Sequence, residues 1–153
     1  MAPAKKTPKP GAPFRIGDHV SRRVVFDAES IRRFATLSGD MNPLHHDDRA
    51  AAAGPFGTLI VSGTQIVALM MGLDATFLSE HHMALGLGFE FRFVKAVPAG
   101  TELTLQWVVA GSTWKASLSG HIVTAEGRAV DDEGTVYVTA IGRNLVRAKR
   151  DGA

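Results

Sequence analysis

The middle of the chain holds a helical segment that is apolar on nearly every face. Its start is marked by Ser62-Gly63-Thr64-Gln65, a match to the capping box in which the first and last side chains satisfy free backbone N–H groups. Apolar side chains follow at every angle of the helix, namely Ile66, Val67, Leu69, Met70 and Met71. A helix with no polar face is expected to be buried. The sequence therefore predicts a buried helix over residues 63–72.

The second half of the chain has the two-residue period of β-strands. Residues 88–93 alternate phenylalanine with other residues, which predicts that Phe89, Phe91 and Phe93 share the buried face of a strand. Further strands are expected at Leu103–Ala110, Ala116–Glu126 and Thr135–Val146, with a hairpin turn at Asp131–Gly134.

The first half of the chain is expected to hold a strand region and two shorter helices. The strand region covers Arg15–Phe26, and Asp27 is a suitable N-cap for the helix that follows it. Gly39 is suited to end that helix, and a second helix is expected at Asp48–Ala53. Helices early and antiparallel strands late predict an α+β fold in which a sheet wraps a buried helix.

Length and composition are those of one globular domain. The 153 residues are 45% hydrophobic and 21% charged, and the absence of cysteine excludes disulfides and thiol chemistry. We expect a disordered basic leader over residues 1–13, the domain over 14–147 and a flexible tail over 148–153. No apolar run is long enough to span a bilayer and the N-terminus lacks a signal-like apolar core, so we expect a cytoplasmic protein with no membrane partner.

Basic residues gather at the two ends of the chain. Lys5, Lys6 and Lys9 lie at the N-terminus, and four Lys or Arg residues lie between positions 143 and 150, whereas the formal net charge is only +2. Such ends are usually solvated. The body of the chain has no basic stripe with interleaved aromatic residues, so we expect no nucleic-acid partner.

The loop between the two shorter helices combines a carboxylate with an imidazole. Asp40 and His45 lie five residues apart, and Gly39 and Pro43 restrict the loop backbone. We expect Asn42 to bond that backbone. Catalytic groups are often carried by loops that rigid elements hold in place, and a carboxylate and an imidazole can divide acid and base work on one water.

This loop resembles the signature of the MaoC-like or (R)-specific enoyl-CoA hydratase family, an aromatic residue followed after a short interval by S-G-D-x-N-P-L-H. Every position of that signature is present between Phe34 and His45. The likeness extends over about Phe14 to Val146 and includes, less closely, the family's F-x-x-P-V-x-x-G-D-x-L segment at Phe93–Leu103. The resemblance implies a hot-dog fold, in which an antiparallel β-sheet wraps a central buried α-helix. It also implies (R)-specific hydration of trans-2-enoyl-CoA to (R)-3-hydroxyacyl-CoA, or the reverse dehydration.

Carried onto this chain, the resemblance implies that Asp40 and His45 hold the catalytic water, with either one as the acid or the base. It also implies that the backbone N–H of Gly63 stabilises the thioester oxygen, since a glycine allows close approach of the substrate. Ser62 stands where relatives often carry His or Gln, and it either caps the helix or contacts the substrate. Met71 stands near the place of a serine that relatives can carry, and a thioether donates no hydrogen bond.

A metal site is one alternative explanation of the loop. The side chains of His45-His46-Asp47-Asp48 are all possible ligands, but adjacent residues seldom face one ion, and the other histidine pair is His81-His82. We therefore expect no metal. No bound cofactor is expected either, because coenzyme A would enter as part of the substrate.

The resemblance also implies partners. The substrate would be an acyl thioester of coenzyme A or of acyl carrier protein in fatty acid metabolism, and the protein would form at least a homodimer with two helices inside a continuous sheet. Two alternatives stay open. One is an acyl-CoA thioesterase on the same fold, and the other is a non-catalytic acyl-thioester-binding subunit, which Ser62 and Met71 would fit.

Overall fold

The structure is a computed structural model that describes residues 11–149. Residues 1–10 of the predicted leader and 150–153 of the predicted tail lie outside the described residues, so the predicted domain limits stay predictions. In chain order the elements are β1 (His19–Phe26), α1 (Ala28–Ser38), the 3-10 turn η1 (Pro43–His45), α2 (Asp48–Ala53), α3 (Gly63–Ser79), β2 (His82–Phe93), β3 (Thr101–Lys115), the 3-10 turn η2 (Ala116–Leu118), β4 (Gly120–Val130) and β5 (Val136–Ala148).

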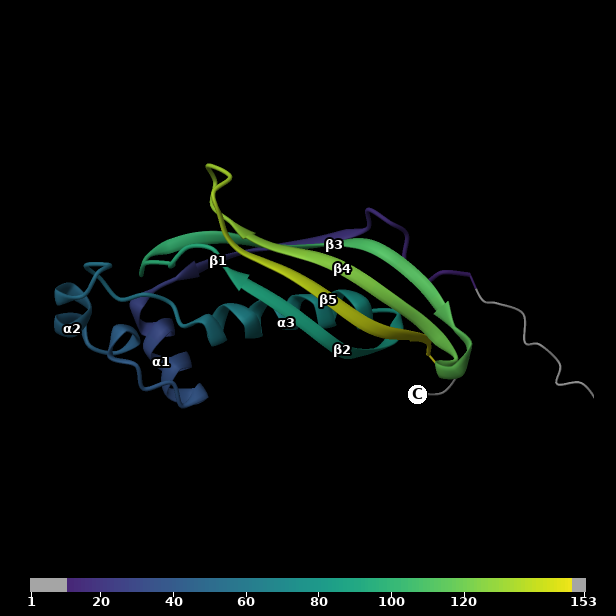
Figure 1. The fold of residues 1–153 in the computed structure, drawn as a ribbon, viewed down its shortest axis with the longest axis horizontal. Coiled ribbons are helices and arrows are strands. Elements are labelled where there is room, and N and C mark those ends of the chain that lie inside the picture. Colours follow the sequence, from purple (N-terminus) through teal and green to yellow (C-terminus); the bar gives the residue numbers. More distant parts are fainter. Residues whose placement is uncertain (1–10, 150–153) are drawn as a thin grey trace, which may run out of the picture.

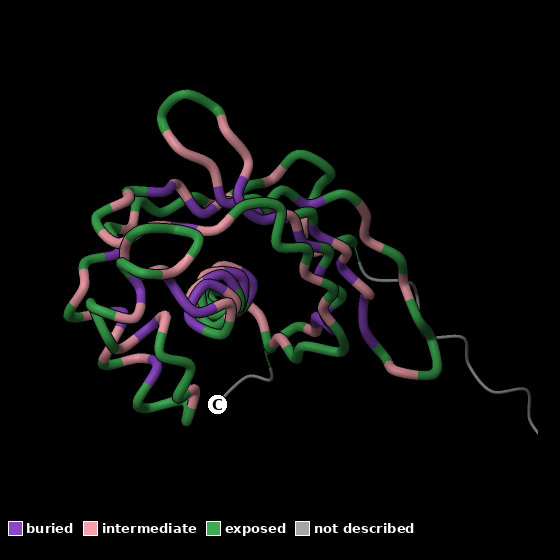
Figure 2. The backbone as a smooth tube through the Cα atoms, turned by 60° about the vertical axis from the view of Figure 1, so that its left-hand side comes forward, coloured by how far each residue is buried: buried purple, intermediate pink, exposed green. Residues whose placement is uncertain are grey.

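The strands form one antiparallel sheet in the order β1-β3-β4-β5-β2. Figure 1 shows this sheet as a curved layer over α3, with α1 and α2 at one end of the molecule. In Figure 2, α3 is seen nearly end-on with the sheet arching around it. A sheet wrapped around a central helix is the hot-dog fold, as the sequence predicted.

The core lies between α3 and the concave face of the sheet. Ile66 and Met70 of α3 are buried against Trp107 of β3, whose indole Nε1 donates a hydrogen bond to the Met70 carbonyl at 2.8 Å. The rings of Phe89 and Phe91 meet Trp107 edge-on, with centroids 6.0 and 6.3 Å away. Burying each large apolar side chain stabilises the fold by about 1.5–3 kcal/mol, so this contact fixes the helix to the sheet.

Only one side of α3 is buried. Met70 and Leu78 face the sheet, whereas Ala68, Met71 and Ala75 are exposed on the outward side. The prediction of a helix buried on every face is therefore wrong for a single chain. The physical reason is that a curved sheet covers one side of a helix and leaves the other side open.

Several element boundaries differ from the prediction. β2 begins at His82 and not at residue 88, and β4 continues to Val130. α3 does not end at Gly72 but continues to Ser79, because Leu73 and Leu78 extend the apolar pattern through the glycine. β3 runs on to Lys115, so β4 begins at Gly120 and not at Ala116. The turn between them places Ser119 in the left-handed region, with φ of 47°. A serine in the sequence does not predict this backbone conformation.

Phe93 corrects the predicted burial of β2. Phe89 and Phe91 are partly buried against the core, but Phe93 is 56% exposed. The alternation was predicted correctly. The predicted burial is wrong because Phe93 is the last residue of its strand, where its ring contacts the first residue of α3, Gly63, but stays largely open to solvent.

Local predictions based on caps and turns are confirmed. The Asp27 carboxylate accepts a hydrogen bond from Ser30 N at 2.8 Å at the start of α1, and Gly39 ends α1 with φ of 74°. Asp131–Gly134 forms the turn between β4 and β5, with φ of 83° at Gly134. α2 has the predicted bounds, Asp48–Ala53. Among residues 11–149, no helix has the length and apolarity that crossing a bilayer requires.

Candidate active site

The acid–base loop, named for the candidate acid and base Asp40 and His45, runs from the end of α1 through η1 to α2. Asp40 N donates to the Ala35 carbonyl at 2.9 Å, which continues the cap at Gly39. The Asn42 side chain accepts from Leu44 N at 3.1 Å, so Asn42 bonds the loop backbone as predicted. Pro43 occupies the first position of η1, where no backbone N–H is needed. These contacts hold Asp40 and His45 at opposite ends of a short, fixed segment.

Asp40 and His45 converge. His45 Nε2 lies 3.5 Å from Asp40 Oδ2, and the side chains are 8% and 30% exposed, respectively. A separation of 3.5 Å is longer than a charge-assisted hydrogen bond, so both atoms can bond one water that approaches from the exposed side of Asp40.

A backbone carbonyl fixes the orientation of the His45 ring. His45 Nδ1 lies 2.8 Å from the Ile60 carbonyl oxygen. Because a carbonyl oxygen only accepts, Nδ1 carries the hydrogen, and in the neutral ring Nε2 presents its lone pair toward Asp40. The pair therefore offers two acceptors, a carboxylate oxygen and an imidazole nitrogen, to one donor such as water.

Two residues that support the loop were missed by the sequence analysis. His46 Nε2 donates to the Asp40 carbonyl at 2.7 Å, and Arg32 Nε of α1 donates to the His46 carbonyl at 3.1 Å. The Arg32 guanidinium also pairs with Asp48 of α2. His46 had been considered only as a metal ligand, and no spacing signal in the sequence connects Arg32 with this loop.

Ser62 is fully buried at the start of α3 and acts as the helix cap. Its Oγ accepts hydrogen bonds from Gln65 N at 3.3 Å and from Thr64 Oγ1 at 3.1 Å. Only this half of the predicted capping box is formed, because the Gln65 Oε1 atom is buried without a partner among the described residues. The geometry favours the capping role of Ser62 over a contact with substrate.

Gly63, the first residue of α3, lies under the ring of Phe93. A Cβ atom at position 63 would come within 2.8 Å of Phe93 Cζ. The space next to this backbone, predicted to admit a thioester, is thus occupied by an exposed aromatic ring in this structure. Met71 lies on the outward side of α3, further along the helix.

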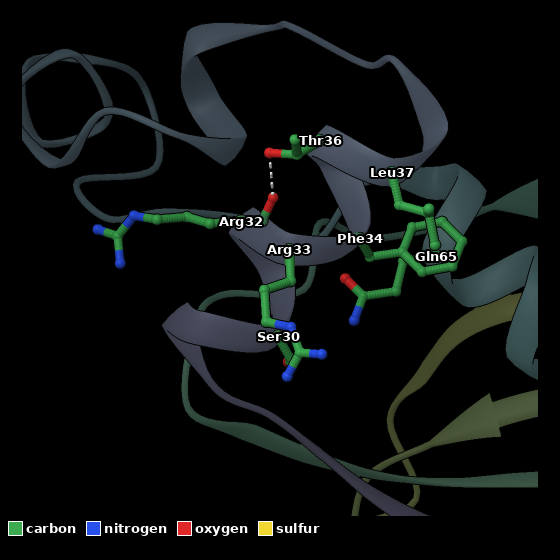
Figure 3. A pocket seen from close by; sticks show the side chains of 7 residues that line it. All are labelled: Ser30, Arg32, Arg33, Phe34, Thr36, Leu37 and Gln65. Carbon is green, nitrogen blue, oxygen red and sulfur yellow. Dashed lines mark hydrogen bonds between the residues drawn. The ribbon is translucent and has the colours of Figure 1, made fainter.

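A groove of about 650 Å³ runs between α1 and the first turn of α3 (Figure 3). Phe34 and Leu37 provide apolar walls, and Arg33 and Gln65 provide polar groups. Leu37 belongs to the last turn of α1, just before the loop that carries Asp40. One end of the groove is therefore lined by a residue that directly precedes the acid–base loop in the sequence.

A second buried carboxyl group lies deeper under the sheet and was also missed. Asp74 of α3 is fully buried, and its Oδ2 accepts a hydrogen bond from Asn144 Nδ2 of β5 at 2.8 Å. Burial raises the pKa of Asp74 to about 6, although the hydrogen bond from Asn144 opposes that rise. Within residues 11–149, no three His, Asp or Glu side chains are grouped so that they could hold a metal ion.

Comparison with known proteins agrees with the fold. The MaoC like domain family matches residues 5–131. The sheet around one helix defines a hot-dog protein, and the loop after α1 brings a carboxylate and an imidazole together. The chain belongs to the MaoC-like domain family.

Individual relatives carry hydratase and dehydratase names. The chain is 27% identical over 127 residues to the 3-hydroxyacyl-thioester dehydratase Z of Mycobacterium tuberculosis, covering 81% of this chain and 83% of that protein. It is 32% identical over 126 residues to a UPF0336 protein of Clavibacter michiganensis, covering 78% and 83%. The structure of an (R)-hydratase from A. caviae, described as involved in PHA biosynthesis, has a TM-score of 0.77 and 28% identity, covering 90% and 98%. These names support a hydro-lyase activity for the family member described here.

Proposed function

We propose that the protein catalyses (R)-specific hydration of a trans-2-enoyl thioester to the (R)-3-hydroxyacyl thioester, or the reverse dehydration. The observation that carries the proposal is the approach of His45 Nε2 to Asp40 Oδ2 at 3.5 Å on a fixed loop. Two acceptors at this distance suit a water that must lose a proton while its oxygen forms a bond. Proton transfer by positioned groups of this kind contributes typically about 10²–10⁴-fold to rate.

The hydration adds all three atoms of one water molecule to the substrate. The water donates one hydrogen bond to His45 Nε2 and one to Asp40 Oδ2. As the water oxygen bonds C3 of the enoyl group, one of the two residues takes a proton from the water and then gives that proton to C2 on the same face. The two hydrogens and the oxygen of water thus end on the substrate, and both residues return to their starting states.

Negative charge grows on the thioester oxygen as C2 becomes enolate-like. The backbone N–H of Gly63 is the proposed donor, because the first N–H groups of α3 have no partner within the helix and lie at its positive end. One such donor is worth about 3 kcal/mol in enzymes where it has been removed. Substrate binding then requires the Phe93 ring to move away from Gly63.

The proposed substrate is a thioester of coenzyme A or of acyl carrier protein in fatty acid metabolism, and the proposed assembly is a homodimer. Two exposed apolar surfaces support the dimer: the outward side of α3 with Ala68 and Met71, and the edge strand β2, where Leu85 and Leu87 are about half exposed. A second copy that extends the sheet at β2 would cover both.

The reaction is tested by two signals recorded in parallel. With a trans-2-enoyl-CoA substrate, we expect loss of the enoyl absorbance without release of free thiol, and chiral analysis should find the (R)-3-hydroxyacyl product. Thiol release with an unchanged enoyl signal would instead identify a thioesterase. No change in either signal, with the substrate bound, would identify a non-catalytic binding subunit.

Substitution of the paired residues tests their roles. Asp40→Asn and His45→Ala should each lower kcat by roughly 10²–10⁴-fold with little change in the fold, because each removes one partner of the water. Asp132→Asn in the exposed β4–β5 turn and His81→Ala beyond α3 are the matched controls and should leave kcat unchanged. Turnover equal to the unsubstituted protein in both site variants would exclude the assignment.

A further inference from the structure

Gln65 has a polar end that nothing in the described chain satisfies. Its side chain is 5% exposed, and its Oε1 atom is buried without a hydrogen-bond partner among residues 11–149. The capping box would have used this side chain to bond the start of α3, but only the Ser62 half of the motif is formed. A buried acceptor without a donor is costly, so its presence points to a donor supplied from outside the chain.

The surroundings of Gln65 indicate the chemistry of that donor. Gln65 lines the groove along α1, whose walls are the apolar side chains of Phe34 and Leu37 (Figure 3). Arg33 lines the same groove and forms no ion pair or hydrogen bond with any described residue. The groove therefore combines apolar walls, one amide and one unpaired cation.

We propose that this groove binds the pantetheine arm of the thioester and that the Gln65 side chain turns its Oε1 atom into the groove to accept a hydrogen bond from an amide N–H of that arm. This inference rests on the proposed function, since it assumes a thioester substrate. A hydrocarbon acyl chain offers no donor to Gln65 and no anion to Arg33. The arm offers both, because it carries amide groups along its length and a phosphate at its end. Gln65 is in this view a positioning residue, two positions after the proposed oxyanion donor Gly63.

The test compares two unreactive ligands that differ in one atom group. The first is the thioether S-butyl-N-acetylcysteamine, which has an amide N–H, and the second is the analogue in which oxygen replaces that N–H. Dissociation constants come from titrations followed by backbone amide NMR, which also reports whether each variant is folded. We expect the unsubstituted protein to bind the amide ligand about tenfold more tightly than the ester analogue, the loss expected for an unsatisfied acceptor.

Three variants separate a specific contact from a general effect. Gln65→Leu and Gln65→Met, which keep the bulk of the side chain, should bind both ligands equally. Gln106→Leu, the same kind of change on the other face of β3 from Trp107, should keep the tenfold preference. Equal binding of the two ligands by the unsubstituted protein, no binding of either, or a preference that survives in both Gln65 variants would overturn the proposal.

This experiment requires no turnover. A Gln65-dependent preference in a protein that does not hydrate enoyl thioesters would reject the proposed reaction and keep the arm-binding role. Hydration of enoyl thioesters without any Gln65-dependent preference would do the opposite.

Discussion

Asp74 is a buried carboxyl group that couples stability to pH. Burial raises its pKa to about 6 in the folded protein, above the ordinary value of 3.8. The folded state therefore holds this proton more tightly than the unfolded chain, and the group favours folding most at low pH. The free energy of unfolding should fall as pH rises from about 4 to above 6, by at most about 3 kcal/mol from this residue.

Asp74→Asn isolates that contribution. Asparagine keeps an oxygen for the hydrogen bond from Asn144 but carries no charge, so the variant should be more stable than the parent at pH 8 and similar to it at pH 4. Urea unfolding at a fixed protein concentration measures both. A parent protein and variant whose stabilities differ by the same amount at both pH values would show that Asp74 does not cause the pH dependence.

The residues found from the sequence are those whose partners lie nearby in the chain. Asp40 and His45 share one loop, and their convergence follows from a short, restricted backbone. Asp74 and its partner Asn144 are separated by 70 positions, so their contact depends on how α3 packs under β5. The sequence predicted Gln65 only as part of a capping box, because a sequence does not show that the Oε1 atom will lack a hydrogen-bond donor.

The contribution of the Ser62 cap to the stability of α3 can be measured by substitution. Ser62→Ala removes the acceptor for Gln65 N at the start of α3 and should lower the free energy of unfolding by about 0.5–2 kcal/mol. Because Ser62 is fully buried and bonded within the helix turn, KM should change by less than about threefold.

Asp27→Ala, the equivalent change at the start of α1, provides the comparison. It should lower the free energy of unfolding by a similar amount and should also leave KM unchanged. A large rise in KM for Ser62→Ala alone would instead support a contact between the Ser62 hydroxyl and the substrate.

Element boundaries were predictable where a specific residue marks them. Asp27, Gly39 and Ser62 each bond or shape a helix end, and each boundary was found. Gly72 and Ser119 show the converse. Gly72 is tolerated inside a helix whose apolar face packs on the sheet, and Ser119 is forced into a left-handed turn by the two strands that it joins. Tertiary packing outweighs local preference at both positions.

The proposed homodimer depends on an uncovered strand edge. Among residues 11–149, β2 pairs only with β5, and Leu85 on β2 is exposed. If a second copy continues the sheet there, Leu85→Lys should weaken the dimer at least about tenfold, since charged residues protect edges against pairing. Sedimentation velocity over a range of concentrations measures this change.

Val25→Lys on β1, the opposite edge of the sheet, is the matched control and should leave the dimer intact. A monomeric parent protein would contradict the proposed assembly. A dimer that only Val25→Lys weakens would place the interface at β1. Sequence patterning predicted the sheet around α3. It could not predict that one side of α3 stays open, because the extent to which the sheet covers the helix depends on the curvature that the five strands adopt together.

The contact between Phe93 and Gly63 links two positions that are distant in sequence. The ring at the end of β2 fills the volume that a side chain at position 63 would need. Any larger residue at position 63 must drive the ring outward into solvent, so a smaller residue at position 93 is the natural compensation. Among homologous chains, we therefore expect these two positions to covary in size, with a bulky aromatic at 93 accompanied by glycine at 63.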